Sequence, residues 1–379
     1  MIKRSWKIIQ ELNHLYSSGK IGNITIKNRL VRSATWESRA TEDGYVTDSL
    51  IEFYEELARG GIGLIITGYI AVDPIGAQTT RMTRIYDDSY ISGQKKLVKS
   101  IHEYSDNKVA AQIAHTGNNF ISPDKENVGP SPIKDPITKK VCRVLKNNEI
   151  EDIINKFAQA SFRAYDCGYD MIQLHAGHGY LLSDFISPFT NRRIDEYGGS
   201  TLSRLKIIID IYNQIRDRLG KAFPITIKLT TQDFLGNGKG LDLEEGVAIA
   251  KYLVDIGFDA IEPTSGRTNL RMTNNRSFPS VIFNAPEDGN YFLPNAKALK
   301  PIMKDSALIL MGGIRDPIYA NNLLKERMVD FISMCRPFIC EPDLANRWKA
   351  GDIRPSLCTN CNACFGLGER KEVSCVLKK

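Results

Sequence analysis

Eight short apolar runs alternate with longer amphipathic segments along this chain, and no other feature of the sequence limits its fold as strongly. The runs are rich in β-branched residues and occupy residues 30–33, 64–67, 109–113, 171–174, 225–229, 260–263, 308–311 and 331–334. Helical patterns lie between them, including residues 50–59, 150–167, 202–218, 243–256 and 318–325. Strands that are each followed by a helix indicate a parallel sheet, and eight such units predict an α/β fold, a (β/α)8 TIM barrel.

The composition changes once, near residue 352. Before that point no Ser-, Gly- or Pro-rich linker divides the chain, so residues 1–351 are predicted to form one barrel. Residues 352–379 are predicted to form a short cysteine-rich C-terminal extension, because they hold Cys358, Cys361, Cys364 and Cys375. Cysteines clustered in this way favour metal or redox chemistry over a disulfide framework.

The charge pattern bears on location and partners. Charges interrupt the first twenty residues every few positions, which predicts an amphipathic helix and not a signal peptide. The longest apolar stretch, residues 61–72, is too short to cross a bilayer. We therefore expect a cytoplasmic protein without a membrane partner. The 50 basic and 44 acidic residues are spread along the chain, so their net charge of +6 predicts no nucleic-acid partner.

Polar residues and glycines follow almost every predicted strand. In a barrel of this kind, the chemistry lies in the loops after the strands, at the carboxyl-terminal face. The residues at those positions are Ser33, Ala34, Thr35, Thr67, Gly68, Tyr69, Gln112, His115, His175, His178, Tyr180, Lys228, Gly312, Gly313, Cys335 and Arg336. A barrel without a site would not require this pattern, so the sequence predicts a functional site at that face.

The segment after the fourth strand carries the richest pattern. Residues 175–200 read HAGHGYLLSDFISPFTNRRIDEYGGS and hold two of the five histidines, three residues apart, followed by Tyr180. Two imidazoles can both donate to one ligand oxygen, and the tyrosine hydroxyl can deliver a proton. The alternative is that His175 and His178 are satisfied loop histidines and that Tyr180 packs in the wall. Zinc is disfavoured because no third ligand of a suitable kind lies nearby in the sequence.

This segment resembles the old yellow enzyme family of FMN-dependent ene-reductases, whose pattern is H-x-x-H-G-Y-L, then F-x-S-P, N-x-R and Y-G-G-S. The matching residues are His175, His178, Gly179, Tyr180, Leu181, Phe185, Ser187, Pro188, Asn191, Arg193, Tyr197, Gly198, Gly199 and Ser200. Residues 27–29, 33–35, 63–68, 112–117 and 335–337 resemble the family's other strand ends. The resemblance covers about residues 15 to 350.

The resemblance implies roles for single residues. Gln112 would hydrogen-bond the pyrimidine edge of FMN, and Lys228 stands where the family usually has an arginine near flavin N1 and O2. The lysine keeps the charge but loses the bidentate fork. Alternatively, Lys228 only caps the barrel mouth. The full set of implied cofactor-binding residues is Ser33, Ala34, Thr35, Gly68, Tyr69, Gln112, His175, Lys228, Gly312, Gly313, Cys335 and Arg336.

Phosphate binding has a separate physical argument. Barrels often hold phosphate on the loops after the seventh and eighth strands, and here those loops contain Gly312, Gly313 and Arg336. Glycine backbone N–H groups can close on phosphate oxygens, and an arginine can donate two parallel hydrogen bonds to them. These loops therefore favour a phosphorylated cofactor.

The activity that the resemblance implies is that of an NAD(P)H:flavin oxidoreductase. NADH or NADPH would reduce FMN, and a hydride would then pass to the β-carbon of an α,β-unsaturated carbonyl compound. His175 and His178 would stabilise the enolate-like oxygen, and Tyr180 would protonate the α-carbon. These three residues are the predicted catalytic residues.

The tail and one tryptophan depart from the simplest family members. The cysteines have the spacing C-x2-C-x2-C-x10-C, which resembles the cluster-binding tail of enoate and dienoyl-CoA reductases with one residue fewer in the third gap. Four cysteines can bind a [4Fe–4S] cluster or zinc, or stay as thiols. Because the sequence shows no second flavin domain to supply electrons, we predict no metal. Trp36 either narrows the pocket or packs behind the flavin.

Two rival functions stay open. A flavin amine dehydrogenase or demethylase on the same barrel would require an aromatic cage, for which Trp36 and Tyr69 are candidate walls. A redox-sensing binding protein would use the flavin and the cysteine tail without turnover. The sequence does not distinguish NADH from NADPH, identify the enone, or decide whether the chain forms a homo-oligomer.

Overall fold

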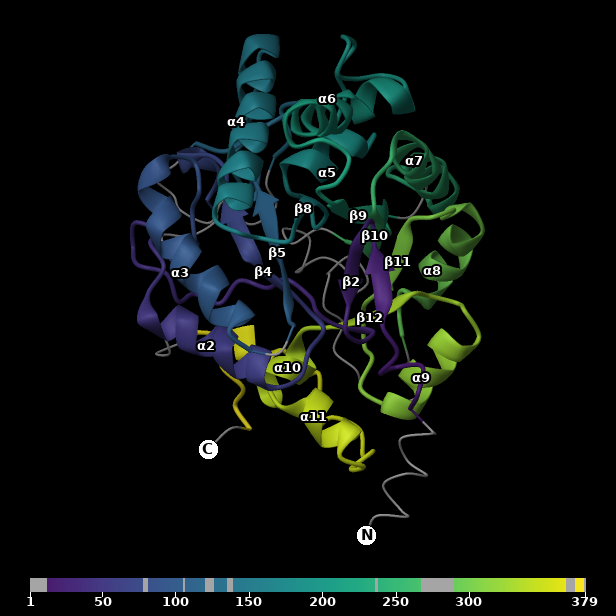
Figure 1. Cartoon of the computed structure of the whole chain (residues 1–379). Coiled ribbons are helices and arrows are strands. Elements are labelled where there is room, and N and C mark those ends of the chain that lie inside the picture. The colour runs from purple at the N-terminus through teal and green to yellow at the C-terminus, as the bar shows by residue number, and fades with distance from the viewer. Residues whose placement is uncertain are drawn as a thin grey trace.

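The structure, a computed structural model, describes residues 12–77, 81–104, 106–119, 126–134, 139–235, 238–266, 290–365 and 372–377. Its centre is a closed barrel of eight parallel strands (Figure 1). The strands are β3 (Leu30–Arg32), β4 (Leu64–Ala71), β5 (Lys108–Ala114), β8 (Met171–Ala176), β9 (Ile225–Gln232), β10 (Ala260–Ser265), β11 (Ala307–Leu310) and β12 (Phe331–Met334). Because β12 pairs with β3, the ring is closed and the predicted (β/α)8 barrel is confirmed.

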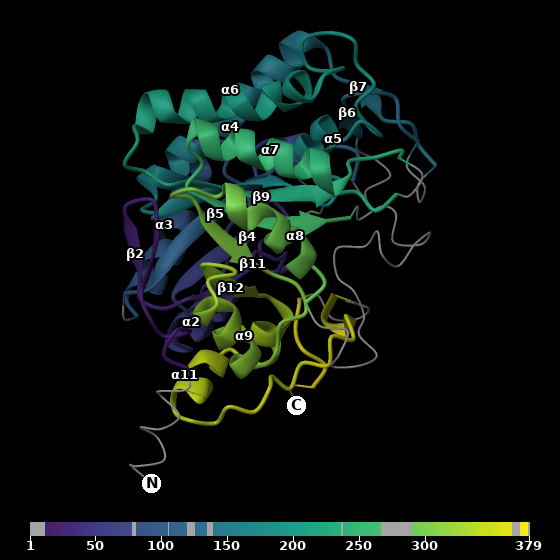
Figure 2. The same cartoon turned by 90° about the vertical axis from the view of Figure 1, so that its right-hand side faces the viewer.

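Helices surround the barrel in both views (Figures 1 and 2). Their order is α2 (Asp48–Arg59), α3 (Ile91–His102), α4 (Asn147–Asp166), α5 (Leu181–Ile186), α6 (Thr201–Leu219), α7 (Leu243–Ile256), α8 (Leu293–Leu299), α9 (Pro317–Lys325), α10 (Arg336–Cys340) and α11 (Leu344–Lys349). Several begin at a residue whose side chain accepts a backbone N–H of the first turn, as N-caps do. These caps are Thr47, Ser200, Asp242 and Asp316.

Two apolar cores hold the barrel together. The larger core lies between the strands and the surrounding helices and includes Phe157 and Trp348. The smaller core fills the barrel interior, where Ile21 and Ile26 meet residues such as Phe331. Both isoleucines come from a hairpin of β1 (Gly19–Ile21) and β2 (Ile24–Ile26). Because this hairpin packs against the first residues of the barrel strands, the opposite, carboxyl-terminal ends are left to form a pocket.

The predicted amphipathic helix over the first twenty residues is wrong where the structure describes them. Residues 1–11 lie outside the described residues, residues 12–16 form a turn, and Gly19–Ile21 is strand β1. Gly22, with φ of +55°, turns the chain into β2. The segment is extended because alternate side chains bury in the barrel, with Gly19 and Ile21 buried and Lys20 exposed.

The described part of the tail packs on the barrel. It leaves α11 and runs past the foot of α9 (Figure 2), where the Ser356 N–H donates to the Arg315 carbonyl at 2.9 Å. Further on, the Val373 N–H donates to the Glu37 carbonyl at 3.0 Å, and Glu372 pairs with Arg39 at 2.6 Å. The tail therefore contacts the loop after β3. Within the described residues, no helix is both long and apolar enough to cross a membrane.

Candidate active site

One pocket opens where β3, β9, β11 and β12 end, and it encloses about 580 Å³ including open solvent. Most of the predicted cofactor-binding residues line it, together with His178. They are Ser33, Ala34, Thr35, Lys228, Gly312, Gly313, Cys335 and Arg336. The sequence analysis did not single out Tyr291, Ser333 and Asn360, which also line it. The remaining lining residues flank the predicted phosphate-binding residues, and they are Met311, Ile314, Met334 and Pro337. The pocket therefore brings together residues from the beginning, middle and end of the chain.

The loops after the first and last strands are joined at the pocket. The Ser33 N–H donates to the Met334 carbonyl at 3.0 Å, and the Cys335 thiol donates to Thr35 Oγ1 at 2.9 Å. On the loop after β11, Gly312 has a φ of +101°, and a Cβ there would lie 2.8 Å from the rings of Tyr291 and Phe292. A larger residue would therefore be strained and crowded at this turn.

The tail forms part of the pocket wall. Arg336 Nη1 donates to the Asn360 carbonyl at 3.1 Å and to Asn362 Oδ1 at 2.7 Å. Asn360 Nδ2 is buried without a hydrogen-bond partner among the described residues. Arg336 and Lys228 are cations in the pocket lining, and among the residues that the structure describes no carboxylate lines the pocket. A glycine turn, two cations and a spare amide donor fit a phosphorylated cofactor.

A buried polar network lies below the pocket. Lys228 Nζ donates to Ser33 Oγ at 2.8 Å and lies 3.2 Å from Glu262 Oε2. Gln173 Nε2 donates to Glu262 Oε2 at 3.1 Å, and Gln112 Nε2 donates to Gln173 Oε1 at 2.6 Å. Gln112 does not line the pocket itself, but this chain of bonds connects it to Lys228. The side chain of Lys228 is 2% exposed and paired inside the barrel, and its role towards the flavin stays a prediction.

Four rings gather beside the pocket, at the carboxyl ends of β4 and β8 and in the loop after β8. The centroid of His175 lies 4.9 Å from that of His178 and 4.8 Å from that of Tyr180. Tyr69 lies 5.4 Å from Tyr180 and 5.9 Å from His175. His178, which also lines the pocket, connects this cluster to it. The structure thus brings the three predicted catalytic residues together and adds Tyr69 to them.

Both histidines of the cluster are neutral at physiological pH. Burial lowers the pKa of His178 to about 3, and it lowers the pKa of His175 well below its usual value. His175 Nδ1 accepts the Gly177 N–H at 3.2 Å, so the single proton of its neutral ring lies on Nε2. His178 Nε2 lies 2.9 Å from Thr264 Oγ1. His175 therefore presents Nε2–H as a hydrogen-bond donor.

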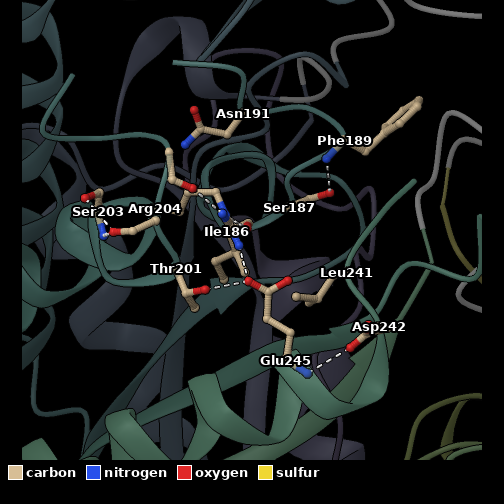
Figure 3. Close-up of polar contacts among 12 residues, drawn as sticks. Ile186, Ser187, Phe189, Asn191, Thr201, Ser203, Arg204, Leu241, Asp242 and Glu245 are labelled. Carbon is tan, nitrogen blue, oxygen red and sulfur yellow. Dashed lines mark hydrogen bonds and ion pairs between the residues drawn. The ribbon is translucent and has the colours of Figure 1, made fainter. Parts of the chain in front are cut away.

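A second network fixes the segment that carries these residues (Figure 3). Arg204 of α6 donates to the Ile186 carbonyl at 2.7 Å and to the Gly199 carbonyl at 2.6 Å, and it pairs with Glu245 of α7. Asn191 Nδ2 donates to the carbonyls of Phe185 and Tyr197 at 2.8 and 2.7 Å. Phe185, Asn191, Tyr197 and Gly199 therefore shape the loop and do not line the pocket.

Gly68 is placed by a buried ion pair. Its N–H donates to Tyr54 Oη at 2.6 Å and to Glu37 Oε1 at 3.0 Å, and Glu37 pairs with Arg32 at 3.0 Å. A Cβ on Gly68 would clash with Glu37 and with the Thr35 carbonyl. Gly68 does not line the pocket, but its close approach to residue 35 sets the position of Tyr69. Trp36 packs in a small cluster with Tyr69.

The tail cysteines lie close to the pocket, because Cys364 packs in one cluster with Cys335 of the pocket lining. Cys358 and Cys364 are buried, Cys375 is half-buried and Cys361 is exposed. Burial raises the pKa of the Cys364 thiol to about 12. Across the described residues, no three His, Cys, Asp or Glu side chains are arranged to hold a metal ion. The absence of a metal from this tail stays a prediction.

Comparisons with known proteins show the family of the chain. The model of the NADH:flavin oxidoreductase / NADH oxidase family matches residues 14–353. An NADH oxidase from Thermoanaerobacter brockii is 34% identical over 361 residues, which cover 93% of this chain and 54% of that protein. The 4,4'-dithiodibutanoate disulfide reductase from Rhodococcus erythropolis is 30% identical, and the match covers 93% of this chain and 92% of that protein.

A solved structure is similar over most of the chain. 2-Naphthoyl-CoA reductase in complex with 2-naphthoyl-CoA matches with a TM-score of 0.84 and 28% identity, over 93% of this chain and 54% of that one. The chain thus spans about half the length of the NADH oxidase and of the naphthoyl-CoA reductase. The resemblance in the sequence is confirmed: the chain belongs to the NADH:flavin oxidoreductase / NADH oxidase family, of old yellow enzyme type, whose cofactors are FMN and NAD(P)H.

Proposed function

We propose that this protein is an FMN-dependent ene-reductase. It takes a hydride from NADH or NADPH and delivers it to the activated C=C bond of a small α,β-unsaturated carbonyl compound. The observation that carries the proposal is the cluster of His175, His178 and Tyr180 next to a pocket with two cations. Neutral nitrogen donors and a phenol suit a carbonyl oxygen and a carbon that must be protonated.

The predicted cofactor-binding residues divide into two groups by the part of FMN that they would bind. Gly312, Gly313, Cys335 and Arg336, on the loops after β11 and β12, would hold the phosphate. The ring system would be bound by Ser33, Ala34, Thr35, Gln112 and Lys228, with Gly68, Tyr69 and His175 beside it. When bound, FMN supplies the hydride transfer that no side chain can perform.

The histidines would bind and polarise the carbonyl group. His175 offers Nε2–H, since its Nδ1 accepts the Gly177 N–H. His178 is held by Thr264 and forms part of the pocket wall. Both rings are neutral, so they stabilise negative charge on the carbonyl oxygen as hydrogen-bond donors and do not protonate it.

Tyr180 would give its proton to the α-carbon. Burial raises the pKa of its hydroxyl, and the hydrogen bond from Tyr69 lowers it. The donor is therefore fully protonated at neutral pH, and Tyr69 stabilises the phenolate that remains after transfer. Water can reprotonate Tyr180 once the product leaves.

Steady-state turnover distinguishes this function from its rivals. FMN-reconstituted protein is given NADH or NADPH together with 2-cyclohexenone, 4,4'-dithiodibutanoate or no acceptor, and the products are identified by mass. We expect oxidation of the nicotinamide to depend on the enone, with one saturated ketone formed per NAD(P)H. Turnover with the disulfide alone would point to the chemistry named for the Rhodococcus relative. Oxidation of an amine by an added electron acceptor would support a dehydrogenase.

Three features remain predictions. These are the division into a barrel of residues 1–351 and a tail of residues 352–379, a cytoplasmic location, and assembly into a homo-oligomer. Limited proteolysis, cell fractionation and light scattering of the purified chain test them in turn. Cleavage near residue 352 that leaves a folded barrel would support the division.

A further inference from the structure

Glu262 is a carboxylate at the centre of the barrel whose contacts the proposed function does not use. Its side chain is 0% exposed, and on β10 it is the register partner of Lys228 on β9. Its Oε1 accepts hydrogen bonds from Ser33 Oγ and Ser333 Oγ, both at 2.8 Å. A buried carboxylate is costly unless it is paired and hydrogen-bonded, and here its ion-pair and hydroxyl partners all line the pocket.

Glu262 also sets the orientation of two amides. A carboxylate accepts hydrogen bonds and cannot donate them, so Gln173 must turn its NH₂ group to Glu262, at 3.1 Å, and its oxygen to Gln112. Gln112 then donates through Nε2 at 2.6 Å, which leaves its Oε1 as an acceptor. The pyrimidine ring of a flavin has one N–H group, at N3, and an acceptor is what that group requires.

The same carboxylate opposes the charge of Lys228. Reduction of a flavin places negative charge on its pyrimidine ring, and a nearby cation stabilises that charge. Glu262 Oε2 lies 3.2 Å from Lys228 Nζ, and both side chains are buried. At such a separation inside a protein, the field of the carboxylate cancels much of the field of the lysine.

We propose that Glu262 is a positioning residue that holds Gln112 as an acceptor through Gln173 and keeps the midpoint potential of bound FMN low by offsetting Lys228. The inference rests on the proposed function, because it needs FMN in the pocket. We therefore expect Glu262 to affect the affinity and the midpoint potential of FMN, although Glu262 does not line the pocket.

The midpoint potential of bound FMN, measured by anaerobic dye equilibration, tests the charge balance. Glu262→Gln keeps the shape and removes the charge, so we expect the potential to rise by at least about 30 mV, which is tenfold in favour of the reduced cofactor for a two-electron couple. Asp259→Asn is the matched control. Asp259 directly precedes the same strand and pairs with Arg216 at 2.7 Å, at the opposite end of the barrel, and its loss should leave the potential unchanged.

Lys228→Gln tests the same balance from the other side and is informative even if Glu262→Gln does not fold. It leaves the carboxylate uncompensated, so the potential should fall. A potential that is unchanged or lower in Glu262→Gln, or unchanged or higher in Lys228→Gln, overturns the inference while the proposed function stands. Wild-type protein that binds no FMN contradicts the proposed function itself.

The hydrogen bonds from Gln112 through Gln173 to Glu262 are tested separately. Gln173→Leu removes the link between Glu262 and Gln112 but keeps both charges, so the dissociation constant of FMN should rise about tenfold, the effect of one hydrogen bond. The potential should change less than in Glu262→Gln. An FMN affinity equal to that of wild type would remove the positioning role of Glu262.

Discussion

Tyr69 and Tyr180 are hydrogen-bonded through their hydroxyl groups, and their ring centroids lie 5.4 Å apart in an edge-to-face contact. Burial raises the pKa of both hydroxyls, and the bond between them opposes this at Tyr180 and adds to it at Tyr69, as it does when Tyr69 donates to Tyr180. Tyr69 lies within β4, and Tyr180 lies in the loop after β8. A phenol that must release a proton is thus supported by a second phenol.

Replacement of Tyr180 separates the two halves of the reaction. Tyr180→Phe removes the proton donor, so we expect enone reduction to slow by at least about 100-fold, as for loss of a general acid. Reduction of FMN by NADH should stay within about twofold of wild type, because it needs no proton from this group. Stopped-flow absorbance of the flavin measures both steps. Equal rates of enone reduction in the two proteins would exclude Tyr180 as the donor.

Tyr69→Phe tests the supporting phenol. The phenolate of Tyr180 loses one hydrogen bond of about 1.5 kcal/mol, which corresponds to a rate about tenfold lower. FMN affinity is measured alongside, so that a loss of cofactor is not mistaken for a slower reaction. Tyr165→Phe is a suitable control, since Tyr165 is 51% exposed on α4. If the two variants reduced enones equally fast, Tyr69 would be only a wall of the pocket.

Buried histidines make the fold sensitive to acid. Burial lowers the pKa of His115 to about 4 from its usual 6.5, and those of His175 and His178 are lowered as well. Between pH 6.5 and 4 the unfolded chain binds a proton at His115 that the folded protein does not. The free energy of unfolding therefore falls as the pH falls, by about 1.4 kcal/mol per pH unit for such a histidine.

His115→Asn isolates one of these protons. His115 Nδ1 accepts the Gly117 N–H at 3.0 Å, and an asparagine oxygen can accept the same bond. Urea unfolding at pH 7 and pH 5 measures how far the free energy of unfolding falls with pH. In the variant this fall should be smaller by about 1.4 kcal/mol per pH unit, the contribution of one proton. An identical pH dependence in both proteins would mean that His115 titrates normally in the folded state.

Gly246 in α7 lies against β9 and should not tolerate a methyl group. In an exposed helix Gly→Ala stabilises by about 1 kcal/mol. Here a Cβ would clash with the Thr231 carbonyl oxygen, so Gly246→Ala should instead destabilise by about 1–3 kcal/mol. Ala248→Gly, at an exposed position of the same helix, should cost about 1 kcal/mol. Thermal unfolding of both variants checks the sign, and a more stable Gly246→Ala would refute the packing argument.

Much of the fold could be predicted from the sequence because the barrel strands are apolar runs separated by long helices. All eight runs are strands, and α7 has its predicted bounds. The hairpin of β1 and β2 was not predicted, because strands of three residues show no periodicity. Strand β9 continues to Gln232 past its apolar run, since its polar residues are paired with those of β10.

The site was predictable where residues follow strands and unpredictable where partners meet across the barrel. Ser33, Lys228 and Arg336 were identified from position and resemblance. Glu262 was missed, although a single acidic residue in an apolar strand was a signal. Its role depends on Lys228 of the neighbouring strand, and the sequence does not show that pairing. Asn360 gave no signal at all, since only the folded tail brings it to the pocket.

One measurement tests the central claim most directly, namely the absorbance of the FMN-reconstituted protein during anaerobic addition of NADH or NADPH and then of 2-cyclohexenone. The account predicts that the flavin bands bleach with the nicotinamide and return with the enone. The corresponding saturated ketone, added in place of the enone, should leave the bands bleached. Protein that cannot be reconstituted with FMN, or reduced flavin that the enone leaves bleached, would contradict the assignment of an ene-reductase.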